Sequence, residues 1–134
     1  MTDTGKTSNG TPVWITGEGP PVILVHGVIM DHRMWNAQVA ALSDAYRVIC
    51  LDMLGHGDAP DPPGERTLAD FTGQVDEVIG EFCAGARPVL GGFSMGGLIG
   101  RHRLQEEGGA QRTRRFFSVG SPQTGTLAAQ VIPR

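Results

Sequence analysis

The chain has 134 residues, a length that suits one modest domain with a buried core. Hydrophobic residues make up 40% of it and charged residues 19%, which is typical of globular proteins and excludes disordered, collagen-like and coiled-coil classes. The formal net charge of −3 argues against nucleic acid as a main partner, because phosphate binding needs a basic face.

Apolar stretches and cysteines restrict the cellular setting. The longest apolar runs, such as VILV at 22–25, are too short to span a bilayer, and the polar start lacks the apolar region of a signal peptide. We therefore expect a cytoplasmic protein. Cys50 and Cys83 fall within expected regular elements, which predicts buried free thiols and no disulfide. We expect neither a metal site nor a cofactor.

The first half of the chain alternates apolar runs with turns. VWIT at 13–16 predicts a short strand, and PVILVHG at 21–27 has the continuous β-branched pattern of a strand covered on both faces. Residues 34–43 suit a short helix. YRVICLD at 46–52 repeats the buried-strand pattern, and a loop rich in Gly and Pro follows at 53–66.

The second half continues this alternation. Apolar residues recur at three- and four-residue steps over 67–82, which predicts an amphipathic helix that Thr67 and Asp70 begin with a capping box. Three more elements are expected, namely a strand at 87–93, a helix at 96–107 and a short strand at 115–121. The pattern predicts a single α/β domain with an open, mostly parallel sheet flanked by helices.

A serine motif lies where one expected strand meets one expected helix. Residues 92–96, GFSMG, fit GxSxG, which places a nucleophilic serine on a sharp turn at the carboxyl end of a sheet. Ser94 is therefore the candidate nucleophile. Glycine is needed at 92 and 96 because the two backbones approach closely. A phosphate-binding loop fits less well, since no Lys follows and GxGxxG is absent.

A serine that attacks an acyl carbon needs backbone N–H donors for the developing oxyanion. Met95 supplies one candidate at the amino end of the expected helix. Val28 supplies the other, because it follows a strand that ends in His26 and Gly27. An ordinary strand-to-loop turn is the alternative interpretation of that pair.

Three segments, LVHGVIMDHRMW, RVICLDMLGHGDAP and VLGGFSMGG, together resemble the amino-terminal half of an α/β-hydrolase. The resemblance covers about residues 9–100, whereas residues 101–134 are atypical. It is greatest to small carboxylesterases, enol-lactonases and cofactor-free haloperoxidase-like enzymes.

The resemblance implies roles for individual residues. Ser94 would be the nucleophile, the N–H groups of Val28 and Met95 would form the oxyanion hole, and Asp52 and His56 would shape the loop that contains them. Serine at this position implies acyl transfer on a small carboxylic ester or lactone, and it argues against dehalogenase and epoxide hydrolase chemistry.

The acid and the histidine of a triad are missing from the chain. In this family both follow the serine far downstream. No Asp follows Ser94, and the only later histidine, His102, lies about 12 Å along the expected helix at about 1.5 Å per residue, whereas a base must come within about 3 Å. The other candidates lie further along the chain or at positions that are not the base in this family: Glu106, Glu107, His26, His32 and His56.

Composition changes after the serine. Residues 1–94 hold five Lys or Arg against twelve Asp or Glu, whereas residues 95–134 hold six Arg against two Glu. One alternative is that the chain is a truncated or frame-shifted product. The other is that these residues are genuine and the chain stops early. RFFSVGSPQTGT favours the second, because it resembles the strand and loop that follow the helix after the serine turn in lipase-like members.

Three functional readings follow from these observations. The first is an ester or lactone hydrolase. The second is an inactive module that self-associates through an exposed sheet edge. The third is perhydrolase or haloperoxidase activity with the same triad.

Overall fold

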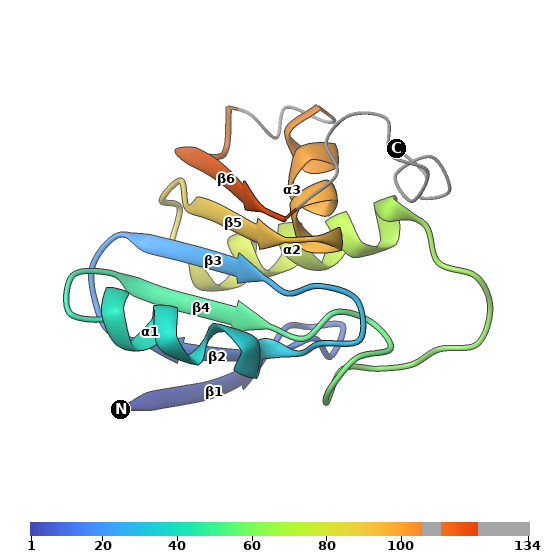
Figure 1. Cartoon of the computed structure of the whole chain (residues 1–134), viewed down its shortest axis with the longest axis horizontal. Helices are drawn as coiled ribbons and strands as arrows, with labels where there is room; N and C mark the ends of the chain where they lie inside the picture. The colour runs from blue at the N-terminus through green and yellow to red at the C-terminus, as the bar shows by residue number, and fades with distance from the viewer. Residues whose placement is uncertain (106–110, 121–134) are drawn as a thin grey trace.

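A six-stranded sheet organises residues 1–105 and 111–120, the part of the chain that the computed structural model describes (Figure 1). Its strands are β1 (Thr2–Lys6), β2 (Pro12–Thr16), β3 (Pro21–Val25), β4 (Arg47–Leu51), β5 (Val89–Phe93) and β6 (Arg115–Val119). The strand order is β1-β2-β4-β3-β5-β6. Neighbours from β4 to β6 pair in parallel, whereas β2 is antiparallel to both β1 and β4. The expected mostly parallel sheet is confirmed.

Helices cover both faces of this sheet. They are a 3-10 turn η1 (His32–Trp35) and the helices α1 (Asn36–Leu42), α2 (Leu68–Phe82) and α3 (Met95–Gln105). In Figure 1, α1 lies in front of the sheet, and α2 and α3 lie behind it. Among the described residues, no helix combines the length and the apolar character that crossing a membrane would need.

The central strand β3 is buried along its whole length, as its continuous apolar run predicts. Val22 and Leu24 pack in the core on the side of α1, together with Trp35. Ile23 and Val25 pack in the larger core beneath α2 and α3. Alternate residues therefore serve opposite cores, which fixes the register of the strand that leads to the candidate site.

Helix α2 begins where the sequence predicts. The Thr67 side chain accepts from the Asp70 N–H, and the Asp70 carboxylate accepts from the Thr67 N–H at 2.8 Å, so the capping box is present.

Cys50 and Cys83 are buried free thiols, and burial raises their pKa values to about 12 and about 11. Neither thiol is therefore poised to react.

The elements differ from expectation at their ends. β1 was not predicted, because it is an almost wholly exposed edge strand of polar residues that carries no apolar pattern. The helix expected over 34–43 starts as the 3-10 turn η1, whose N-cap is Asp31. Three positions of the expected helix and strand lie outside the described residues: Glu106, Glu107 and Ser121.

Candidate active site

Ser94 occupies the turn between β5 and α3. Its φ of 55° lies in the left-handed region, which costs a non-glycine residue on the order of 1–3 kcal/mol and persists only where the surroundings fix it. Two backbone contacts do so on either side. The Ser94 N–H donates to the Val119 carbonyl at 2.9 Å, and the Ser94 carbonyl accepts from the Gly97 N–H at 3.0 Å.

Two glycines make this turn possible, as the sequence predicts. A Cβ added to Gly92 would lie 2.4 Å from the carbonyl carbon of Gly96. A Cβ added to Gly96 would lie 2.2 Å from the carbonyl oxygen of Val25, at the end of β3. Both contacts are with backbone, which has little freedom to move aside. The close approach brings the end of β3 against the start of α3.

The loop after β3 lies beside the serine. A Cβ added to Gly27 would come within 3.3 Å of the Ser94 Cβ. Val28 follows this glycine in sequence and is 46% exposed. Met95 is the first residue of α3, where N–H groups have no acceptor within the helix. The structure therefore places Gly27 and Ser94 together, with both candidate oxyanion donors directly following them in sequence.

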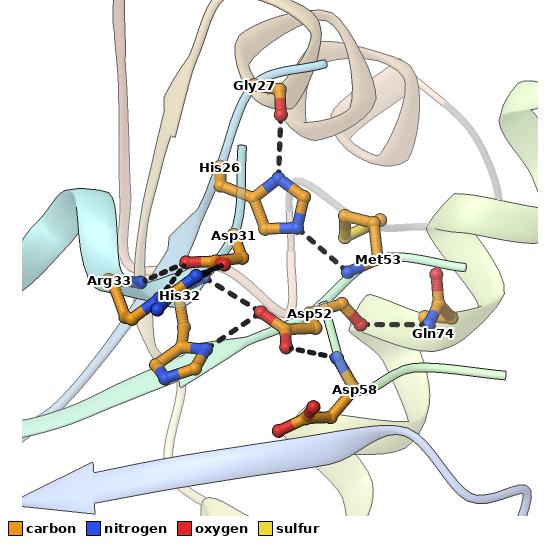
Figure 2. Close-up of polar contacts among 9 residues, drawn as sticks. All are labelled: His26, Gly27, Asp31, His32, Arg33, Asp52, Met53, Asp58 and Gln74. Carbon is orange, nitrogen blue, oxygen red and sulfur yellow. Dashed lines mark hydrogen bonds and ion pairs between the residues drawn. The ribbon is translucent and has the colours of Figure 1, made fainter. Parts of the chain in front are cut away.

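His26 is a buried connector between two loops (Figure 2). Its Nδ1–H donates to the Gly27 carbonyl at 2.7 Å, and its Nε2 accepts from the Met53 N–H at 2.9 Å. Burial lowers the pKa of the ring below its usual value. His26 is therefore a neutral structural residue, and both of its ring nitrogens are already engaged.

Asp52 is a buried carboxylate at the end of β4 that gathers N–H donors (Figure 2). Its Oδ1 accepts from the backbone N–H of His32 at 2.8 Å and from the ring Nδ1–H at 2.9 Å. Its Oδ2 accepts from the Asp58 N–H at 2.9 Å. A Cβ on Gly57 would lie 2.1 Å from Oδ2, which explains the glycine there. This geometry agrees with a structural role for Asp52.

Gln74 completes the same network, and sequence reasoning missed it. Its Oε1 accepts from the Leu54 N–H at 2.9 Å, and its amide donates to the Thr11 hydroxyl at 3.0 Å and to the Asp52 carbonyl at 3.3 Å. The available signal was its position: a glutamine on the apolar face of α2, one residue before the buried Val75, needs polar partners in the core.

The remaining histidines also have partners of their own. The Nδ1 of His56 lies 3.0 Å from the Leu54 carbonyl. The Nδ1–H of His102 donates to the Thr72 hydroxyl at 3.0 Å, and that hydroxyl donates to the Leu68 carbonyl at 2.8 Å. His102 therefore joins α3 to α2 along the helix pair.

Three side chains offer possible metal-ligand atoms within 4.8 Å of one another: Asp31, His32 and Asp52. The Asp52 oxygens already accept N–H groups. Asp31 caps η1 and pairs with Arg33 at 2.7 Å, and this hydrogen bond holds the pKa of the Asp31 carboxyl at about 2. A cation would have to displace these donors, so the trio fits a structural role.

Comparison with known families identifies the family to which the chain belongs. A family model described as the alpha/beta hydrolase family matches residues 22–132. The chain therefore belongs to the α/β-hydrolase family.

Individual relatives refine this assignment. The chain is 43% identical over 84 residues to the (E)-2-((N-methylformamido)methylene)succinate hydrolase of Acinetobacter baylyi, a match that covers 62% of this chain and 31% of that protein. A solved hydrolase from Pseudomonas aeruginosa shares 28% identity with a TM-score of 0.80, over 96% of this chain and 49% of that one. The enol-lactonase from Burkholderia xenovorans shares 32% identity with a TM-score of 0.74, over 85% and 45%. The chain thus spans about a third of the curated relative and about half of the solved structures.

Proposed function

We propose that this chain carries the nucleophile and the oxyanion hole of a serine hydrolase that acts on a small carboxylic ester or lactone. Ser94 attacks the acyl carbon, and the N–H groups of Val28 and Met95 bind the developing oxyanion. The observation that carries this proposal is the left-handed conformation of Ser94 between β5 and α3, with Gly27 packed against it. The names of an enol-lactonase and a succinate hydrolase among the relatives support a small-molecule substrate.

In this proposal the general base comes from outside the chain. All four histidines of the sequence lie in the described residues, and each has a hydrogen-bond partner other than Ser94. A serine hydroxyl without a base is a weak nucleophile, although an oxyanion hole and a binding pocket retain some catalysis. The reaction itself requires no metal and no cofactor.

Labelling of the serine tests this proposal. The full chain is treated with a fluorophosphonate probe, with and without imidazole as a soluble base, while circular dichroism monitors the fold. We expect slow labelling that imidazole accelerates, that Ser94→Ala abolishes and that the matched control Ser43→Ala leaves intact. Failure of the folded chain to label under either condition refutes the nucleophile and favours the inactive module. Labelling that persists in Ser94→Ala refutes the assignment of the residue.

The perhydrolase alternative uses the same serine and the same oxyanion donors, so labelling does not separate it from ester hydrolysis. Parallel assays with an ester alone and with an ester plus hydrogen peroxide do so. We expect turnover to release the free acid. Formation of a peracid at a comparable rate would favour the perhydrolase. The cytoplasmic location stays a prediction from the sequence.

We also propose that the chain self-associates through β6, which is one of the two edge strands of the described sheet, the other being β1. Phe117 is 40% exposed and Val119 is 50% exposed on this strand, and exposed apolar edge strands favour pairing with another chain. We expect size-exclusion chromatography to show a dimer or a larger species that Val119→Lys shifts toward the monomer. A monomeric wild-type chain at high concentration would refute this proposal.

A further inference from the structure

The loop of residues 27–31, between β3 and η1, is held at both ends by a histidine (Figure 2). Before the loop, His26 accepts from the Met53 N–H through Nε2. After the loop, His32 donates to the Asp52 carboxylate through both its backbone N–H and its ring Nδ1–H. The two histidines therefore bind two consecutive residues at the carboxyl end of β4, His26 to Met53 and His32 to Asp52, and this short segment sets where the loop can lie.

The 27–31 loop is strained between these two ends. Ile29 has a φ of 59°, an outlier for a β-branched residue, and its side chain is 92% exposed. The left-handed backbone conformation costs on the order of 1–3 kcal/mol, and the packing of so exposed a side chain cannot offset this cost. The Gly27 carbonyl accepts from the Met30 N–H at 3.2 Å, which closes the turn around Val28 and Ile29. Hydrogen bonds at the ends of the loop must therefore maintain this conformation.

The two histidines contribute in different ways. His26 is fully buried, and its two ring nitrogens bond to Gly27 and Met53. The His32 side chain is 18% exposed, and its ring stacks on Trp14 of β2, with centroids 3.3 Å apart and planes inclined by 8°. The stack fixes the plane of the imidazole, so that Nδ1–H points at Asp52. Loss of this ring would take one donor from a buried carboxylate and leave the backbone N–H of His32 as the one bond that still joins it to Asp52.

We propose that His32 is a positioning residue for the reaction. Stacked on Trp14 and bonded to Asp52, it keeps the 27–31 loop in the strained turn that directs the Val28 N–H toward the oxyanion formed at Ser94. The inference rests on the proposed function, because it needs Val28 as an oxyanion donor. His32 touches no reacting atom, and it acts only through the loop.

Three variants test this role by the rate of fluorophosphonate labelling at Ser94. His32→Leu removes the ring donor, and we expect labelling to slow by about tenfold to a hundredfold, approaching the roughly 10²–10³-fold effect of losing an oxyanion donor. His32→Asn keeps a donor near the position of Nδ1, and we expect it to recover most of the rate. His102→Leu is the matched control, because it removes an Nδ1 hydrogen bond, to Thr72 of α2, that lies outside the 27–31 loop and its two histidines. We expect it to label at the wild-type rate.

Amide hydrogen exchange of residues 28–31 gives a second readout that does not require a reactive serine. We expect His32→Leu to accelerate exchange there and His102→Leu to leave it unchanged. Unchanged exchange in His32→Leu, or faster exchange with an unchanged labelling rate, would overturn the proposal. If the wild-type chain shows no labelling that depends on Ser94, the proposed function fails and exchange alone decides whether His32 holds the loop.

A further variant covers the case in which His32→Leu does not fold. Trp14→Leu keeps both His32 donors and removes only the stack that orients the ring. We expect a smaller slowing of labelling and a smaller increase in exchange over residues 28–31. A Trp14→Leu chain that matches the wild type in both measurements would contradict the role given to the stacked ring.

Discussion

The end of β4 and the turn between β5 and α3 lie at the same edge of the sheet, yet they are stabilised by opposite means. At the end of β4, a buried carboxylate, a buried glutamine and two histidine rings share a network of hydrogen bonds. At the Ser94 turn, two glycines let backbones approach more closely than any side chain would permit. The network spreads its stabilisation over many bonds, whereas the turn depends on single positions where a Cβ has no room.

Gly96→Ala is expected to have the largest effect, because it attacks one of those positions. The new Cβ would lie 2.2 Å from the Val25 carbonyl oxygen, and neither the strand nor the helix can withdraw without disturbing the core. We expect a loss of about 3 kcal/mol or more in the free energy of unfolding, or an insoluble chain. Urea denaturation followed by circular dichroism measures this. An unchanged midpoint would show that the turn is less crowded than described.

Gln74→Leu tests the hydrogen-bonded network. The change leaves the half-buried Leu54 N–H and the buried Thr11 hydroxyl without the partner that joins α2 to two loops. We expect a loss of about 2–3 kcal/mol in the free energy of unfolding, since each orphaned buried group costs about 1–3 kcal/mol. Gln38→Leu, on the exposed side of α1, is the matched control and should change little. Equal effects of the two substitutions would contradict the network.

Acidification tests the same network through His26. Burial lowers the pKa of His26 in the folded chain, so below about pH 6.5 the unfolded chain binds a proton that the folded chain does not. The folded chain is most stable with respect to His26 above that pH, and this part of the free energy of unfolding is lost as the pH falls toward the folded-state pKa of His26. We expect a slope of at most about 1.4 kcal/mol per pH unit. His26→Gln cannot titrate, so an identical slope in this variant would assign the effect to other groups.

Gly73→Ala should give the smallest change, and its sign should be opposite. This glycine lies on the exposed face of α2, where an added Cβ meets nothing within 4 Å. Alanine in a helix interior is favoured over glycine by roughly 0.5–1 kcal/mol, so we expect a gain of that size in the free energy of unfolding. Thermal denaturation would show a raised midpoint. A destabilised variant would show that the helix needs a glycine at 73 for a reason other than space.

Local sequence patterns predicted most of the secondary-structure elements. The continuous apolar runs predicted β3, β4 and β5 because strands covered on both faces have no polar side, and the capping box located the start of α2. The sequence did not predict β1, because an exposed edge strand needs no apolar residues. The GxSxG spacing likewise indicated the turn at Ser94, because its glycines answer a local steric demand.

The network around Asp52 could not be found in this way. Gln74 bonds to Thr11, a residue far from it in the sequence, and His32 stacks on a tryptophan of β2. Such pairs depend on which strands become neighbours, and a single sequence records no long-range partner for a lone polar residue. The importance of Asp52 itself was inferred from the family resemblance, whereas its donors became visible only in the fold.

The place of β3 in the sheet also affects how the chain reaches its folded state. Val22 pairs with Val48 on one side and with Val89 on the other, so this strand is synthesised well before either neighbour. At roughly 5–20 residues per second, a ribosome would leave this apolar segment exposed for on the order of seconds before β5 emerges. Parallel pairing over such separations is slow. The nascent segment around Val22 therefore waits, without its neighbouring strands, for most of the time that synthesis of the described sheet takes.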